Sequence, residues 1–306
     1  MSIVAMFPGL GADYHGMMGA YLAEYPEDVS NLQKWQAASG LDFWQDEVVR
    51  NNIQDAFTNQ YCIHALNLLW WKRIGKNTNA DIVCGHSLGY YAALVAAEVI
   101  TEEESFALIG GIFSAALEQF SQQQGDICVI TLKKNIDESQ FAEYNLEVLA
   151  NNNPMQFVVY GDKEAIDKYI NHTNEKILAH VRMNNIIPFH SSQLKVISEQ
   201  VSAFIEGNIH LKTPKIPISS HITGNLIETS ESAHWHLVNQ LHMKVKWSQM
   251  IDGLIARDAR TFVEIGPNRI LSQIVKWIHT DISVRFVDTF RKKIRKTTMK
   301  PAMVVG

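Results

Sequence analysis

The stretch Ile82-Val83-Cys84-Gly85-His86-Ser87-Leu88-Gly89-Tyr90-Tyr91-Ala92-Ala93-Leu94-Val95-Ala96-Ala97 joins a short apolar run, a turn bounded by two glycines and a helix-forming run. The glycines of a G-x-S-x-G turn allow a sharp bend without a Cβ clash, and the serine hydroxyl is left exposed above the sheet. The helix that follows directs free N–H groups at negative charge developing on a bound carbonyl oxygen. The stretch predicts a strand, a nucleophile turn and a helix, with Ser87 as candidate nucleophile. The alternative is a structural turn that holds a small polar residue.

The composition is that of an ordinary globular protein. With 306 residues, 46% of them hydrophobic, the chain can form one large domain and a smaller one. No stretch is apolar over the length needed to span a bilayer, and the N-terminus lacks a signal peptide's basic residues and cleavage site, so we expect a cytoplasmic protein without a membrane partner. A formal charge of -5 argues against a nucleic-acid partner. We expect a monomer, and three scattered cysteines predict buried thiols rather than disulfides.

Two different patterns of predicted helices and strands divide the chain. An α/β pattern runs to residue 126, beginning with an apolar strand at Ile3–Phe7 and including a capping box at Thr101 that opens a helix. Residues 127–190 then follow a β-α-β-β-α-β order, the ferredoxin-like arrangement, with its first helix at Ile136–Tyr144. The α/β pattern resumes over 191–290. We therefore predict an α/β fold with a hydrolase-like large subdomain around a short parallel sheet, an inserted ferredoxin-like small subdomain, and a basic tail over 291–306 that is either solvated or meets an acidic surface.

A serine hydroxyl needs a base within hydrogen-bond reach, and histidine is the usual choice. Among twelve histidines, His190 stands out because Ile186-Ile187-Pro188-Phe189 holds it at the end of an extended segment, at the junction of the two predicted subdomains. Its position makes it the candidate base. His234 and His236 flank Trp235 in a segment that reads as a polar loop, but no third ligand at suitable spacing accompanies them, so no metal site is predicted.

The chain resembles a known family, the malonyl-CoA:acyl-carrier-protein transacylases and trans-acting acyltransferases of polyketide synthases. Eight short motifs carry this resemblance in chain order. They are Phe7-Pro8-Gly9-x-Gly11 for F-P-G-Q-G, Gln60 for the glutamine of T-Q-P, Gly85–Gly89 for G-H-S-L-G, Asn152-x-Pro154-x-Gln156 for N-S-P-x-Q, Pro188-Phe189-His190-Ser191 for P-F-H-S, Thr223-Gly224 for T-G, Val245-x-Trp247 for V-x-W and Glu264-x-Gly266-Pro267 for E-x-G-P.

The resemblance implies a two-step transfer. Ser87, deprotonated by His190, takes an acyl group from a thioester and yields it to the phosphopantetheine thiol of an acyl carrier protein. Acyl-CoA or acyl-phosphopantetheine is then a substrate, and no cofactor is permanently bound. The resemblance places a backbone carbonyl that orients the histidine at Lys246, and the oxyanion-hole N–H groups at Leu88 and Leu10, although the family has a glutamine where this chain has Leu10.

The residues expected to line the acyl pocket depart from the malonyl-selective pattern. In such members an arginine of an R-G-x-x-M motif pairs with the malonyl carboxylate, and Ile109 occupies that position here. A carboxylate in an apolar pocket without a cation is strongly unfavourable, so an uncharged acyl group is expected. Gln60, His86 and Phe189 complete the predicted pocket. For Phe189, ordinary core packing is an equally good interpretation.

Several functions remain open at this point. The leading hypothesis is a discrete acyltransferase of polyketide biosynthesis with a non-malonyl preference. An acyl-carrier-protein hydrolase of the same fold, in which water replaces the second thiol, accounts equally for the absent arginine, and a malonyl transacylase with an unusual carboxylate partner is a third reading. Intact Ser87 and His190 argue against a non-catalytic carrier-protein-binding subunit. More than a hundred residues follow His190, which argues against an ordinary α/β-hydrolase esterase.

Overall fold

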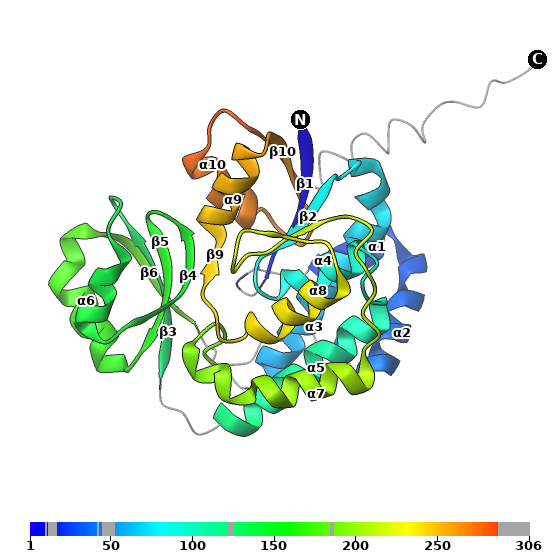
Figure 1. Cartoon of the computed structure of the whole chain (residues 1–306), viewed down its shortest axis with the longest axis horizontal. Helices are drawn as coiled ribbons and strands as arrows, with labels where there is room; N and C mark the ends of the chain where they lie inside the picture. Colours follow the sequence, from blue (N-terminus) through cyan, green and yellow to red (C-terminus); the bar gives the residue numbers. More distant parts are fainter. Residues whose placement is uncertain are drawn as a thin grey trace, which may run out of the picture.

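Two β-sheets organise the chain (Figure 1). The computed structural model describes residues 1–9, 11, 17–41, 43–44, 53–120, 125–183 and 187–286. The larger sheet has the strand order β11-β10-β1-β2-β7-β8, in which every pair is parallel except β7 with β8. Its strands are β1 (Ser2–Phe7), β2 (Ile82–Gly85), β7 (Ile218–Ser219), β8 (Leu226–Ile227), β10 (Ala259–Glu264) and β11 (Ser283–Phe286). The predicted α/β fold class is confirmed.

Helices cover both faces of the larger sheet. Successive side chains of a strand point to opposite faces, and in β1 Ala5 and Phe7 join one core cluster while Val4 and Met6 join the other. The first cluster includes residues of α1 (Met17–Glu24), α2 (Val29–Ser39), α3 (Ile53–Thr78), α4 (Gly89–Ala96), α5 (Glu102–Phe120), α7 (Ser198–Asn208) and α8 (Ser230–Asn239). The second includes residues of α9 (Trp247–Ala256) and α10 (Ile270–Ile278). The capping box at Thr101 forms as predicted, since Thr101 Oγ1 accepts from the N–H of Glu104 at 3.1 Å.

The smaller sheet lies to one side of this core (Figure 1). Its order is β6-β3-β5-β4-β9, formed by β3 (Asp126–Leu132), β4 (Glu147–Asn153), β5 (Gln156–Gly161), β6 (Ile177–Met183) and β9 (Val245–Lys246). The first four strands pair antiparallel in the ferredoxin-like order, with α6 (Lys163–Thr173) between β5 and β6. The fifth strand, β9, comes from beyond the 127–190 segment and pairs parallel with β4.

Two local predictions were wrong. The helix expected at Ile136–Tyr144 is a 3₁₀ segment at Glu138–Tyr144, which begins after Asp137 caps the N–H of Ser139 at 3.0 Å and ends at left-handed Asn145. Its backbone hydrogen bonds close three residues apart, from the N–H of Gln140 to Asp137 O at 3.2 Å and from that of Asn145 to Ala142 O at 3.0 Å. The segment around Trp235 is not a loop but part of α8, which opens with a capping box between Thr229 and Ser232.

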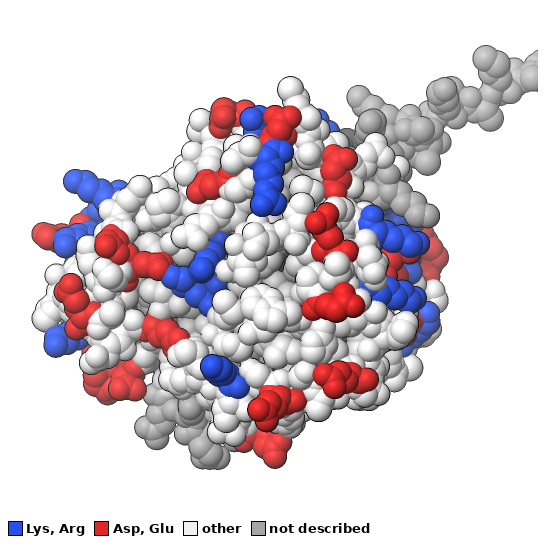
Figure 2. Space-filling model, in the orientation of Figure 1, with Lys and Arg blue, Asp and Glu red and all other residues white. Residues whose placement is uncertain are grey.

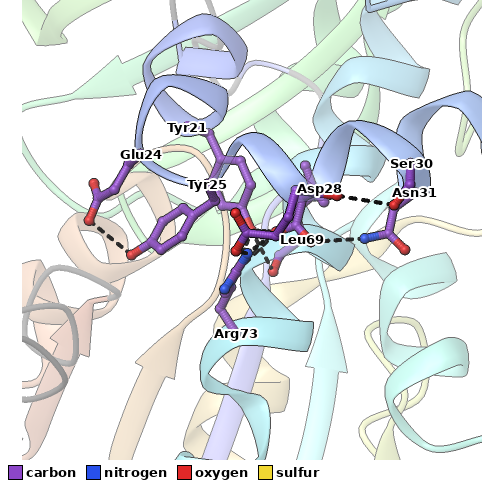
Figure 3. A network of polar contacts seen from close by, with 9 residues as sticks. Tyr21, Glu24, Tyr25, Asp28, Ser30, Asn31, Leu69 and Arg73 are labelled. Atoms are coloured by element: carbon purple, nitrogen blue, oxygen red, sulfur yellow. Dashed lines mark hydrogen bonds and ion pairs between the residues drawn. The ribbon is translucent and has the colours of Figure 1, made fainter. Parts of the chain in front are cut away.

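A polar network fastens the N-terminal helices to α3 (Figure 3). The guanidinium group of Arg73 donates to Asp28 Oδ2 from Nε at 3.0 Å and from Nη2 at 2.7 Å, and it also pairs with Glu27. The Tyr21 hydroxyl donates to the same carboxylate oxygen at 2.6 Å, and the ring of Tyr25 lies 4.2 Å from the guanidinium carbon. This network holds the segment before α2 against α3.

The surface carries charge of both signs. On the face shown in Figure 2, acidic and basic side chains of the described residues are interspersed without a large patch of one sign. Within the described ranges, no helix combines the length and the apolar character that crossing a membrane requires. Cys62, Cys84 and Cys128 are buried and form no disulfide bond. The basic run Arg291–Lys296 lies outside the described residues.

Candidate active site

Ser87 lies at a tight turn between β2 and α4. Its φ of 52° is in the left-handed region, which a non-glycine residue adopts rarely. The turn packs directly against the end of β1: a Cβ on Gly89 would be 2.0 Å from the carbonyl oxygen of Phe7, and a Cβ on Gly9 would be 2.3 Å from that of His86. Glycine is therefore required at both positions, because only it permits this approach of two backbones. The predicted strand, turn and helix are present.

The structure brings Ser87 and His190 together across 103 residues of sequence. Ser87 Oγ is 2.7 Å from His190 Nε2. The other ring nitrogen, Nδ1, is 2.7 Å from the carbonyl oxygen of Gln240, and the N–H of His190 donates to Leu241 O, also at 2.7 Å. The assignment of the orienting carbonyl to Lys246 was therefore wrong. Lys246 lies in β9, where its N–H donates to His221 O. The carbonyl that faces His190 belongs instead to Gln240, the residue that follows α8.

This arrangement defines the chemical state of His190. A carbonyl oxygen only accepts, so Nδ1 carries the proton and Nε2 is free to accept from the serine hydroxyl. Burial lowers the pKa of His190 to about 4, against the opposing effect of the hydrogen bond to Gln240. The imidazole is therefore neutral at pH 7, with Nε2 unprotonated. No carboxylate hydrogen-bonds the His190 ring among the described residues, so a backbone carbonyl takes the place that an aspartate holds in a catalytic triad.

The loop that carries His190 is fixed from the smaller sheet. Glu147 of β4 accepts from the hydroxyl of Ser191 at 2.5 Å and from the N–H of Ser192 at 2.7 Å. His190 itself has φ 74°, a left-handed conformation held between these bonds and the Leu241 carbonyl. Sequence reasoning missed Glu147, and no local signal identifies it, because its partners lie 44 and 45 residues away.

A second polar chain joins the nucleophile turn to the smaller sheet. His86 Nε2 is 2.8 Å from Asn152 Oδ1, Asn152 Nδ2 donates to Gln156 Oε1 at 3.0 Å, and Gln156 Nε2 donates to Thr131 Oγ1 at 3.1 Å. Two of these residues belong to the Asn152-x-Pro154-x-Gln156 motif. The motif thus connects the two sheets next to Ser87.

The structure describes one of the two predicted oxyanion donors. Leu88 follows Ser87, and its N–H makes no hydrogen bond to any described residue, so it is available to a developing oxyanion. Leu10 lies outside the described residues. The flanking Pro8, Gly9 and Gly11 line the cavity beside Ser87.

Two cavities meet at the catalytic pair. The larger, of about 470 Å³, lies between the two sheets. The smaller, of about 30 Å³, lies beside α5. Of the predicted acyl-pocket residues, Gln60 and Ile109 line the small cavity, His86 lines the large one, and Phe189 lines both. None of the described residues lining either cavity is Arg, Lys, Asp or Glu.

A buried cluster of histidine and tyrosine rings next to His190 was not predicted. The ring of His221 lies edge-on to that of His190 at 5.9 Å and to that of His236 at 4.9 Å, and His236 packs against Tyr90 at 4.0 Å. His221 Nδ1 is 2.9 Å from Gly85 O, the carbonyl at the end of the nucleophile strand. Among the described residues, no group of three His, Cys, Asp or Glu side chains comes together as potential metal ligands, around His234 and His236 or elsewhere.

Comparison with known proteins places this fold and site in a class. Residues 6–306 match the family model described as acyl transferase domain. The chain belongs to the acyl transferase domain family and is thus an acyltransferase by descent. Within that class it belongs to the malonyl-CoA:acyl-carrier-protein transacylase family. The malonyl CoA-acyl carrier protein transacylase of Staphylococcus aureus (strain MSSA476) is 30% identical over 299 residues, covering 93% of this chain and 94% of the relative.

Solved structures share the whole fold. The acyl-carrier-protein S-malonyltransferase of Burkholderia pseudomallei 1710b superposes with a TM-score of 0.84 at 23% identity, covering 96% of this chain and 100% of that one. A malonyl-transacylase in complex with its type II polyketide acyl-carrier protein gives a TM-score of 0.83 at 21% identity, covering 94% and 95%. At these identities the likeness concerns the fold.

Proposed function

We propose that this chain is a discrete acyltransferase that receives an acyl group on Ser87 from a CoA or carrier-protein thioester. It then passes the group to the phosphopantetheine thiol of an acyl carrier protein in polyketide biosynthesis. The observation that carries the proposal is the 2.7 Å distance between Ser87 Oγ and His190 Nε2 at the meeting point of two cavities. Relatives named for transfer to acyl carrier proteins support the acceptor, and one solved relative is a complex with such a protein.

The proposed reaction has two balanced halves. In the first, His190 Nε2 takes the proton of Ser87 Oγ as this oxygen attacks the thioester carbonyl, and the departing thiolate recovers the proton from the imidazolium. In the second, the carrier thiol gives its proton to His190 and attacks the acyl-serine ester, and Ser87 Oγ leaves with that proton. The N–H of Leu88 stabilises the oxyanion in both halves, and Leu10 remains the proposed second donor. No resident cofactor takes part.

The acyl group is proposed to be uncharged. Ile109 lines the small cavity together with Ser87 and His190, where malonyl-selective relatives are expected to have an arginine. A carboxylate moved into a cavity without a cation loses its hydration and gains no ion pair, which costs several kcal/mol. Malonyl transfer is therefore disfavoured relative to transfer of a neutral acyl group.

A mass-spectrometric assay tests this function. The intact protein is incubated with acetyl-CoA or malonyl-CoA, then with holo acyl carrier protein, and the mass on each protein is followed. We expect a stable acyl adduct that is absent from Ser87→Ala, transfer of acetyl to the carrier, and slower malonyl transfer. Faster malonyl transfer would overturn the reading of Ile109. Free acid released without transfer would identify the alternative, a hydrolase, and an adduct that survives Ser87→Ala would reject Ser87 as the nucleophile.

A further inference from the structure

The two cavities that meet at Ser87 differ in size and in the exposure of the residues that are not shared between their walls. Ser87, Phe189 and His190 line both of them. The wall of the large cavity includes Trp277, which is 41% exposed, and so reaches the surface. Most side chains around the small cavity are buried, and Ile109 and Ile112 are each 2% exposed. The partly exposed residues in its wall, Ser87 and Phe189, are ones that it shares with the large cavity.

This difference assigns the two ends of a bound thioester. The sulfur of the substrate is attached to a long pantetheine arm that leads to CoA or to a carrier protein, so the arm must run to solvent. The large cavity provides that route. The acyl group lies on the other side of the carbonyl carbon. It therefore occupies the small cavity. This inference rests on the proposed acyl transfer through Ser87.

The volume of the small cavity limits the acyl group. A cavity of about 150 Å³ holds one benzene molecule, and a single water needs roughly 10–15 Å³. The small cavity, at about 30 Å³, therefore has room for a methyl or an ethyl group beyond the thioester carbonyl. We propose that this enzyme selects acyl groups of two or three carbons, acetyl and propionyl, and that Ile109 and Ile112 set this limit from one face of α5.

The packing of α5 on several sides opposes enlargement of the small cavity by movement of this helix. A Cβ on Gly111 would lie 2.4 Å from the Phe204 ring, so this side chain of α7 packs directly on the backbone of α5. On the α2 side, the ring of Phe106 stacks on that of Trp35 with centroids 5.3 Å apart. Phe189 is in turn packed against Phe113 at 6.5 Å. The limit is therefore built into the core of the larger subdomain.

A chain-length series tests the limit. Acetyl, propionyl, butyryl and hexanoyl thioesters of CoA are compared by the rate of adduct formation on Ser87, read by intact mass. We expect acetyl and propionyl to react fastest and hexanoyl to react at least ten-fold more slowly. In Ile112→Ala the optimum should move to butyryl or longer, and in the milder Ile112→Val it should move in the same direction by less.

Ile205→Ala is the matched control, since Ile205 is 1% exposed, lies in α7 and lines neither cavity. It should keep the wild-type order of chain lengths. Hexanoyl acylation as fast as acetyl acylation, or an unchanged order in both Ile112 variants, would overturn the length limit while the acyl-Ser87 adduct still supports acyl transfer. Failure of every thioester to acylate Ser87 would instead overturn the proposed function itself.

Discussion

His190 Nδ1 and the backbone carbonyl oxygen of Gln240 lie 2.7 Å apart, and this hydrogen bond orients the proposed base. A carbonyl stabilises the imidazolium less than a carboxylate does, because it carries only a partial charge. Burial is therefore the largest influence on the ring and lowers the pKa of His190. The consequence is a base that stays deprotonated in mildly acidic solution.

The pH profile of acylation follows from that pKa of about 4. We expect kcat/KM for acylation of Ser87 to change less than about two-fold between pH 8 and pH 5, since the free enzyme keeps His190 neutral throughout. An exposed histidine with a pKa near 6.5 would lose about thirty-fold by pH 5. The measurement is the rate of adduct formation in constant ionic strength buffers, with circular dichroism to verify folding. An acid limb centred near 6.5 would contradict the buried, neutral base.

The hydrogen bond from His221 Nδ1 to Gly85 O predicts contrasting effects of two substitutions. Gly85 ends the strand that leads into Ser87, so its carbonyl positions the turn. His221→Phe keeps an aromatic ring but removes this donor from the Gly85 carbonyl, and we expect a loss of about 1–3 kcal/mol in stability and at least about ten-fold in the acylation rate.

His221→Asn is the matched variant, because the Asn Nδ2 atom corresponds to His Nδ1 and retains the donor. It should recover most of the acylation rate, even though the smaller side chain leaves a cavity that lowers stability. Equal acylation rates in the two variants would show that ring volume, not the bond to Gly85, matters.

The Arg73 network predicts a clear difference between two neighbouring positions. Arg73→Met removes the cation from Asp28, whose side chain is only 12% exposed, and should lower the free energy of unfolding by about 2–4 kcal/mol. Lys72→Met is the control: Lys72 pairs with Glu102 at 2.9 Å, but its side chain is 37% exposed, so the expected loss is below about 1 kcal/mol. Urea unfolding at neutral pH measures both. Similar losses in the two variants would contradict the structural role of the network.

Buried histidines predict acid sensitivity of the fold. Burial lowers the pKa of His64 and of His236 to about 3, from 6.5 in the unfolded chain. Below pH 6.5 the unfolded state binds more protons, so the contribution of each histidine to stability is fully present above 6.5 and is lost as the pH falls toward 3. The slope is about 1.4 kcal/mol per pH unit for each such group.

His236→Phe isolates one of these groups. Neither ring nitrogen of His236 has a hydrogen-bond partner among the described residues, and Phe preserves the packing on Tyr90. The free energy of unfolding at pH 7 should be unchanged or higher. Its slope against pH between pH 6 and pH 4.5 should fall by about 1.4 kcal/mol per pH unit, the effect of one bound proton. Urea unfolding across this range gives both quantities. An unchanged slope would mean that His236 titrates in the folded state as it does in the unfolded one.

Much of the fold could be predicted from local patterns in the sequence. The strand, turn and helix around Ser87 could be predicted because the required φ, the flanking glycines and the apolar runs are properties of adjacent residues. The order of strands in the smaller sheet was predictable for the same reason. Strand pairings between segments distant in the sequence could not be predicted. β9 is two residues long, and it is a strand because it pairs with the edge of β4.

The sequence by itself determined the family, the nucleophile turn and the identity of the candidate base, since each depends on the type of side chain at a given position. Only the tertiary structure decided that Gln240 rather than Lys246 faces His190 Nδ1, because every residue has the same backbone carbonyl and the sequence carries no mark of which one is near. Only the tertiary structure, likewise, decided the two cavity volumes. A volume is what remains after side chains from distant segments have packed, and no single residue encodes it.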